Sequence, residues 1–127
     1  MQKWDVTTGI PDLTGKVAIV TGAKLVTPCT IFIISAANHL HSSASGIGFH
    51  VAQQLAIKGA KVYVGARNSE KAHEAIAEMR KEAPSIKQEH LVPLVMDLGD
   101  LKQVQRVARG LVAKAGRLDI LVNNAAL

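Results

Sequence analysis

Short apolar runs alternate along this chain with longer segments in which apolar residues recur every three or four positions. The runs are rich in Val, Ile and Leu, a composition typical of strands that are buried on both faces of a sheet. Four such strands are predicted, at residues 16–22, 61–66, 91–98 and 118–122.

Three helices are predicted between these strands, because the apolar positions there follow the helical repeat. The first spans residues 46–58 and ends before Gly59, the second closes at Pro84, and the third begins at the capping residue Asp100 and ends before Gly116. The apolar positions are Ile47, Val51, Leu55 and Ala56 in the first helix, Ala72, Ala75, Ile76 and Met79 in the second, and Leu101, Val104, Ala108, Leu111 and Ala115 in the third.

Strands that alternate with helices predict an α/β fold, in which parallel strands are joined by right-handed helical crossovers. The expected architecture is a partial Rossmann-type, doubly wound parallel sheet of four strands and three helices, in one domain over residues 1–127. Ligands bind such sheets outside the carboxyl ends of the strands. Residues 25–44 do not fit the pattern, because strand-to-helix loops in such folds usually have about 2 to 6 residues. We interpret them as an insertion in the first strand-to-helix loop.

Composition and charge limit the range of functions that this chain could have. The 127 residues carry a net charge of +5, but the basic residues are scattered and no aromatic residues are interleaved with them, which argues against a nucleic-acid partner. The single cysteine, Cys29, excludes an intramolecular disulfide and fits a reducing compartment. No signal peptide opens the chain, and no apolar stretch approaches the roughly 20 residues of a transmembrane helix. We therefore expect a cytoplasmic protein without a transmembrane segment.

A glycine-rich pattern is divided between the two sides of the insertion. Thr21, Gly22 and Lys24 close the first strand, and the first helix opens after it. Glycines are needed where backbone N–H groups and a helix N-terminus meet a pyrophosphate, because a Cβ atom would block the turn or the phosphate. The opening residues of the helix are Ser45, Gly46, Ile47 and Gly48.

Joined, the two halves read Thr-Gly-Ala-Lys-Ser-Gly-Ile-Gly, which resembles the Thr-Gly-x-x-x-Gly-x-Gly signature of short-chain dehydrogenases/reductases. Two further segments carry the resemblance. Asp97-Leu98 matches the acid and its neighbour that the family places beside the adenine. Asn123-Asn124-Ala125-Ala126 is similar to the family's Asn-Asn-Ala-Gly motif, with Ala126 in place of the last glycine. The opening of the chain and the order of these motifs are also typical of the family.

The resemblance implies an oxidoreductase that transfers a hydride between a nicotinamide cofactor and a carbonyl or alcohol. It implies that the cofactor is bound by Gly22, Lys24, Ser45, Gly46, Ile47, Gly48, Arg67, Asp97, Leu98, Asn123, Asn124 and Ala125. The end of the second strand decides the type of cofactor, because an acid there accepts the ribose 2′-OH of NAD whereas an Arg pairs with the 2′-phosphate of NADP. This chain has Ala66 followed by Arg67, and its next acid is Glu70. We therefore expect NADP rather than NAD.

No catalytic residue is predicted within the chain. The family uses a Ser and a Tyr-x-x-x-Lys motif beyond the fourth strand, whereas the only tyrosine here, Tyr63, lies inside the second strand and is expected to be a packing residue. The five histidines show no metal-ligand spacing, so no metal site is expected. Three hypotheses stay open: an NADP-dependent reductase lineage whose present chain is inactive because it is truncated, a nucleotide- or partner-binding module without turnover, and an inert mis-spliced product. A homo-oligomer is compatible with each.

Within the family, residues 10–13, 65–67 and 79–84 most resemble the retinol-dehydrogenase-like branch. This likeness does not identify a substrate.

Overall fold

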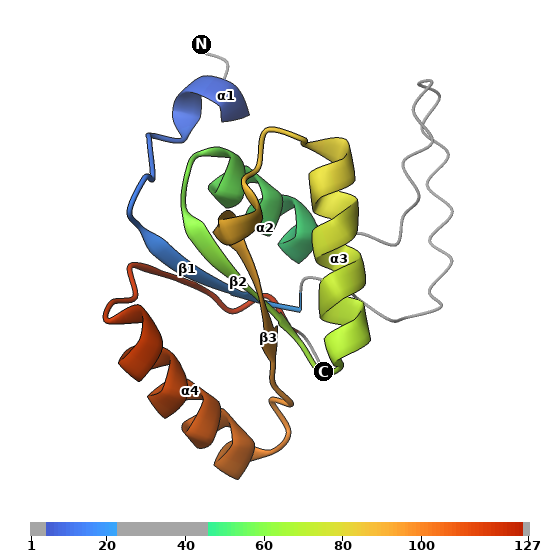
Figure 1. The fold of residues 1–127 in the computed structure, drawn as a ribbon, viewed down its shortest axis with the longest axis vertical. Helices are drawn as coiled ribbons and strands as arrows, with labels where there is room; N and C mark the ends of the chain where they lie inside the picture. The colour runs from blue at the N-terminus through green and yellow to red at the C-terminus, as the bar shows by residue number, and fades with distance from the viewer. Residues whose placement is uncertain (1–4, 23–45, 126–127) are drawn as a thin grey trace.

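The computed structural model describes residues 5–22 and 46–125. Its strands are β1 (Val17–Thr21), β2 (Lys61–Ala66), β3 (Leu91–Val95) and β4 (Ile120–Val122). Its helices are α1 (Val6–Gly9), α2 (Ile47–Ile57), α3 (Ser69–Glu82) and α4 (Leu101–Ala115), with one 3₁₀ turn, η1, at Gln88–His90 (Figure 1).

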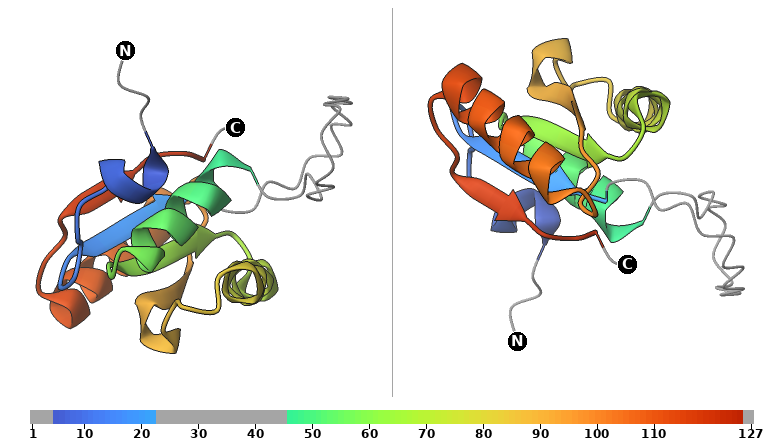
Figure 2. Two further views of the ribbon diagram at one scale, coloured as in Figure 1. Left: turned by 90° about the horizontal axis from the view of Figure 1, so that it is seen from above. Right: turned by 90° about the horizontal axis from the view of Figure 1, so that it is seen from below.

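The four strands form one parallel sheet in the order β3-β2-β1-β4. The first two crossovers proceed outward from β1 to β2 and then β3, through α2 and α3. The third crossover returns past β2 and β1 and adds β4 on the far side of β1 through α4. Because right-handed crossovers in opposite directions place their helices on opposite faces, α2 and α3 cover one face of the sheet and α4 the other (Figure 2). The doubly wound architecture expected from the sequence is thus confirmed.

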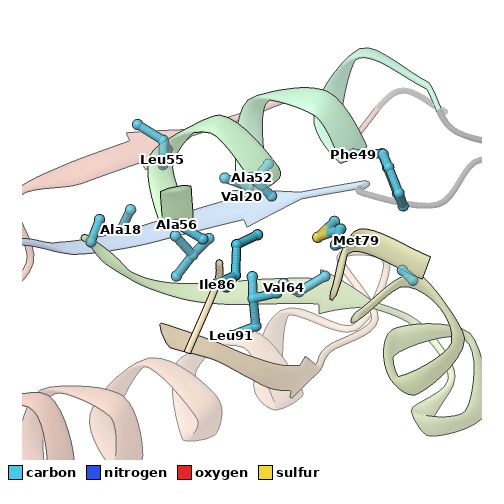
Figure 3. Packing of buried hydrophobic residues seen from close by; sticks show 13 residues of the cluster. Ala18, Val20, Phe49, Ala52, Leu55, Ala56, Val64, Met79, Ile86 and Leu91 are labelled. Atoms are coloured by element: carbon cyan, nitrogen blue, oxygen red, sulfur yellow. The ribbon is translucent and has the colours of Figure 1, made fainter. Parts of the chain in front are cut away.

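The larger core lies on the α2 and α3 face. Phe49 and Met79 are the largest fully buried side chains there, and they pack with Val20, Val62 and Val64 of the central strands (Figure 3). Small residues of α2 facing the strands, Ala52 and Ala56 among them, let the helix lie close to the sheet. This face fixes α2, and with it the residues at the start of that helix.

The opposite face has a much smaller core. It comprises Val17, Ile19 and Tyr63 of the sheet and Leu111 of α4, with Val92, Leu94 and Ala115 packed against them. Tyr63 is buried there with Lys61 Nζ 5.6 Å from its ring centroid, which confirms it as a packing residue. Of the apolar stripe predicted on α4, only Leu111 is buried, and Leu101 is 74% exposed.

Three of the four predicted strands are longer than the observed ones, and β1, at Val17–Thr21 rather than 16–22, differs by only one residue at each end. β3 ends at Val95 rather than 98, because β2 ends at Ala66 and only one more bond, from Met96 N to Ala66 O, continues the ladder. β4 begins at Ile120 rather than 118, after the N–H of Asp119 donates to Val17 O. The sequence reasoning also missed α1 and η1, which are too short to show an apolar periodicity.

Candidate functional site

The residues that follow the four strands gather at one edge of the sheet, because all the strands are parallel. Thr21 of β1 pairs with Gly65 of β2, and Val20 pairs with Val122 of β4. Gly22 and Arg67 follow β1 and β2 directly, and Asn124 is the second residue after β4. The structure therefore brings together, at the carboxyl edge, three segments separated by up to a hundred residues in the sequence.

Gly22 meets two demands that exclude other residues. Its φ of +66° lies in the left-handed region, and a Cβ atom would lie 2.7 Å from Ala125 Cα and 2.9 Å from Ala125 N. Either demand alone strongly favours glycine. The tight turn after β1 thus has the end of the β4 segment packed directly against its backbone.

The Thr21 hydroxyl joins the ends of β1 and β4. Its Oγ1 atom accepts hydrogen bonds from the N–H groups of Asn124 and Ala125, both at 3.2 Å, and donates to Val122 O at 3.3 Å. The side chain is 5% exposed. In the sequence, Thr21 is recognisable only as part of the glycine motif, with no role of its own. A threonine at the last position of a buried strand, before a glycine turn, was the signal that could have identified it.

Asn124 links the same turn to α2. Its Nδ2 atom donates to Gly22 O at 3.0 Å, and a Cβ atom on Gly48 would lie 2.3 Å from that Nδ2. Gly48 is therefore the residue that lets the first turn of α2 approach the Asn124 side chain. This contact connects the end of β1, the end of β4 and the start of α2.

The N-terminus of α2 lies at this edge without a side-chain cap. Gly46 is the N-cap residue and gives no side-chain hydrogen bond, and Ile47, the first helical residue, is 77% exposed. A Cβ atom on Gly46 would meet no atom of the described residues within 4 Å. The first N–H groups of a helix have no intrahelical acceptor, so this end of α2 can receive an anionic group such as a phosphate.

Arg67 is exposed and follows β2 directly along the chain, two residues before α3 begins at Ser69. The next residue, Asn68, caps α3 by accepting from Glu70 N at 2.7 Å. Glu70 thus lies in the first turn of α3, where a carboxylate is favoured by the helix dipole. The end of β2 itself carries a cation and no acid.

Asp97 has a local structural role in addition to its predicted one. Its Oδ1 atom accepts from Gly99 N at 2.9 Å, and its own N–H donates to Gln103 Oε1 at 2.6 Å. Asp100 caps α4 by accepting from Lys102 N and Gln103 N at 3.0 and 3.1 Å, as the sequence indicated. Both carboxylates therefore shape the turn between β3 and α4.

The two asparagines after β4 do not lie together. Asn124 contacts Gly22 on the α2 side, whereas Asn123 lines a cavity of about 410 Å³ between the sheet and α4. Leu98, predicted to lie beside the adenine, is 40% exposed and lines the same cavity. Ala125, whose N–H donates to Thr21 Oγ1, is exposed at the carboxyl edge of the sheet.

Two predicted cofactor contacts, Lys24 and Ser45, lie outside the described residues, as does the predicted insertion at residues 25–44. Within the described ranges, no three or more His, Cys, Asp or Glu side chains are grouped so that they could hold a metal ion. None of the helices in residues 5–22 and 46–125 combines the length and the apolar composition needed to cross a bilayer.

Comparison with known proteins agrees with this geometry. The family model described as short chain dehydrogenase matches residues 41–127. A short chain dehydrogenase/reductase of Colletotrichum higginsianum, dpchH, is 48% identical over 122 residues, which cover 96% of this chain and 25% of that protein. A second, dpfgH of Gibberella zeae, is 41% identical over 98% of this chain and 30% of its own length.

Solved structures show the same likeness. The menthone neomenthol reductase of Mentha piperita superposes with a TM-score of 0.67 at 32% identity, covering 88% of this chain and 32% of that one. A metagenomic short-chain oxidoreductase in complex with NADP has a TM-score of 0.66 at 29% identity, covering 91% and 41%. The chain thus spans about a quarter to two fifths of the length of these relatives. The family model matches more than half of the chain, and the matched residues include the Asn-Asn-Ala segment after β4: this protein belongs to the short-chain dehydrogenase family.

Proposed function

We propose that residues 1–127 form the NADP-binding part of an oxidoreductase that acts on a carbonyl or alcohol. A nicotinamide cofactor supplies hydride transfer in such a protein when it is bound. The observation that carries the proposal is the exposed Arg67 at the end of β2, beside the glycine turn and without an acid before α3. A guanidinium there would pair with the 2′-phosphate that distinguishes NADP from NAD.

The rest of the carboxyl edge fits a dinucleotide. Gly46 leaves open space and gives α2 no side-chain cap, so the first N–H groups of α2 would bind the pyrophosphate. Asp97 has one carboxylate oxygen engaged by Gly99 N, and we place this carboxylate beside the adenine, as the family resemblance implies. We place Lys24, Ser45, Ile47, Leu98, Asn123 and Ala125 around the same cofactor, as the family resemblance implies. The NADP complex of the metagenomic relative supports the choice of cofactor.

The cofactor preference can be tested by titrating the purified chain with NADP(H) and NAD(H) in a calorimeter. We expect NADP(H) to bind more tightly and Arg67→Ala to weaken it by about 1.5 to 3 kcal/mol, roughly 10- to 150-fold, as for a charge-assisted contact. NAD(H) binding should be unchanged. Arg80→Ala, which removes an exposed cation from the far end of α3, is the matched control. Equal affinity for the two cofactors would refute the assignment.

We also propose that residues 25–44 interrupt the phosphate-binding turn. The match of the family model begins at residue 41, which supports this interpretation. Extending a loop from about 4 to 24 residues costs only about 1.6 kcal/mol in closure entropy, so the sheet tolerates it, whereas the turn needs its glycines held together. Deleting residues 25–44 should therefore improve the free energy of NADPH binding by more than it improves the free energy of unfolding. NADPH titration and thermal melting of the two forms would measure these changes. No gain in affinity would show that the loop is accommodated.

We infer, further, that the chain by itself has no turnover. The sequence contains no Tyr-x-x-x-Lys, and Tyr63 is buried inside β2, away from the carboxyl edge. NADPH oxidation with a panel of aldehydes and ketones should equal that of a mock preparation. Reproducible reduction by the purified chain would contradict this. Cofactor binding without turnover distinguishes the binding-module alternative from an inert mis-spliced product, which would bind neither cofactor.

We also propose that the protein is cytoplasmic and that it belongs to the retinol-dehydrogenase-like branch of the family.

A further inference from the structure

The hydroxyl group of Ser69 lies close to the end of β2, at the carboxyl edge of the sheet (Figure 1). Ser69 is exposed and is the first residue of α3. Its Oγ atom lies 3.3 Å from His73 Nδ1, and the same Nδ1 lies 2.7 Å from Ser69 O. A carbonyl oxygen only accepts hydrogen bonds, so Nδ1 carries the hydrogen and Ser69 Oγ is an acceptor in this contact. The contact with His73 therefore does not use the hydroxyl proton of Ser69.

The backbone of Asn68 places Arg67 and Ser69 side by side. Asn68 is extended, with φ −126° and ψ 137°. An extended residue directs the side chains of its two neighbours to the same side of the chain, and the Cα atoms of these neighbours lie at most about 7 Å apart. Within residues 5–22 and 46–125, no carboxylate forms an ion pair with Arg67. The guanidinium is therefore available to an anionic group carried by Ser69.

The residues before Ser69 also suit recognition by a protein kinase. Kinases select their substrates partly by the pattern of charges around the modified residue, and one large class requires an arginine shortly before the serine. The order Arg-x-Ser occurs once in the 127 residues, at Arg67-Asn68-Ser69. Ser85 is exposed as well, but Ala83 stands two residues before it. Charge pattern and exposure thus single out Ser69 between these two serines.

We propose that Ser69 is a phosphorylation site and that its phosphate pairs with Arg67, which withdraws this cation from the 2′-phosphate of NADP. The second half of the proposal rests on the proposed function. In the modification, the γ-phosphoryl group of ATP is transferred to Ser69 Oγ, the hydroxyl proton passes to a base of the kinase, and ADP leaves.

The charge of the phosphate explains the effect on the cofactor. A phosphoserine carries a charge of about −1.5 to −2 at pH 7 and three strong acceptor oxygens. It would therefore occupy the Arg67 guanidinium and repel a second phosphate. Of the adjacent charged residues, Glu70 opposes the new ion pair and Lys71 supports it. Arg67 therefore decides where the phosphate pairs.

The first experiment asks whether Ser69 is modified. The purified chain would be incubated with radiolabelled ATP and the catalytic subunit of a kinase that requires an arginine before the serine, and the modified residue would be located by mass spectrometry. We expect phosphate at Ser69, and Ser69→Ala should abolish this labelling. Arg67→Gln should reduce it, because the kinase loses the charge that it recognises. Ser85→Ala is the matched control and should be labelled like the wild type.

The second experiment measures the pairing with Arg67 without any cofactor. A chain with phosphoserine encoded at position 69 would be titrated with pH and followed by ³¹P NMR. The second pKa of a phosphoserine is about 6, and a paired cation lowers it. Arg67→Gln should therefore raise this pKa by at least roughly 0.3 units. Arg80→Gln, in the last turn of α3, is the matched control and should leave it unchanged.

The third experiment compares the cofactors in a calorimeter. Phosphorylation of Ser69 should weaken NADP(H) binding roughly tenfold or more and leave NAD(H) binding unchanged, whereas Ser69→Ala should bind both like the wild type. The proposal is overturned if Ser69 is not labelled, if Arg67→Gln does not change the phosphoserine pKa, or if the phosphorylated chain binds NADP(H) as tightly as before. If the unmodified chain shows no preference for NADP(H), the proposed function fails instead, and the first two experiments still decide whether Ser69 is modified and pairs with Arg67.

Discussion

Replacing Gly48 by alanine tests the contact that holds α2 against the end of β4. The new Cβ atom would lie 2.3 Å from Asn124 Nδ2 and 3.0 Å from Gly22 O, both far closer than ordinary van der Waals contact. The Asn124 amide is the part that can move, but moving it breaks its 3.0 Å hydrogen bond to Gly22 O. The close approach to Gly22 O remains after the amide has moved.

The expected magnitude follows from two opposing terms. Loss of the hydrogen bond costs about 0.5 to 1.5 kcal/mol, and the residual crowding against Gly22 O adds a similar amount. Alanine gains up to about 1 kcal/mol over glycine in a helix, and less at the first turn. We therefore expect Gly48→Ala to destabilise the fold by roughly 1 to 2 kcal/mol, which lowers the melting temperature by several degrees.

Thermal and urea unfolding followed by circular dichroism would measure this. Gly46→Ala, two residues earlier, is the matched control, because its Cβ atom would meet nothing within 4 Å among the described residues and its φ is −72°. Asn124→Ala takes the amide out of the path of the new Cβ atom and leaves only the contact with Gly22 O, so adding Gly48→Ala to Asn124→Ala should destabilise the fold less than Gly48→Ala does in the wild type. If the two single effects simply add, Asn124 is not the group that Gly48 accommodates, and the reasoning is wrong.

Three further expectations concern stability. The Asp119 carboxylate accepts hydrogen bonds from the Arg117 guanidinium and from Val17 N, the latter at 2.8 Å, and these lower the carboxyl pKa below its usual 3.8. The stabilisation by Asp119 is therefore present above pH 3.8 and is lost as the pH falls through the lowered pKa. The difference in melting temperature between the wild type and Asp119→Asn should be wide at pH 7 and closed in strong acid. Met79→Ala should lower the free energy of unfolding, measured in urea, by about 2 to 5 kcal/mol, because the Met79 side chain is fully buried between α3 and the sheet. A loss below about 1 kcal/mol would mean that the core there is loosely packed. Asp100→Ala should lower the free energy of unfolding by about 0.5 to 2 kcal/mol, because α4 loses its N-cap. Asp100→Asn should keep most of this stability, because an asparagine side chain also caps a helix. Equal losses in both variants would assign the effect to the charge of Asp100 instead.

The alternation of apolar runs and helical stripes was sufficient to predict the four strands, the three main helices and the parallel, doubly wound sheet. These features depend on local periodicity and on the handedness of crossovers, both of which can be read from one sequence. The cap at Asp100 and the left-handed Gly116 were predictable for the same reason, because capping residues act within a few positions along the chain.

The tertiary structure decided which of these residues meet. Thr21 ends β1, Asn124 follows β4 and Gly48 lies in the first turn of α2, and only the pairing of β4 with β1 brings their hydrogen bonds and close contacts together. The structure likewise separated Asn123 from Asn124, because successive residues leaving a strand point to opposite faces. Periodicity marked Leu101 as part of the α4 stripe but could not show that it is exposed. Whether an apolar residue is buried depends on what lies against its helix, and that is a property of the assembled layers and not of the segment.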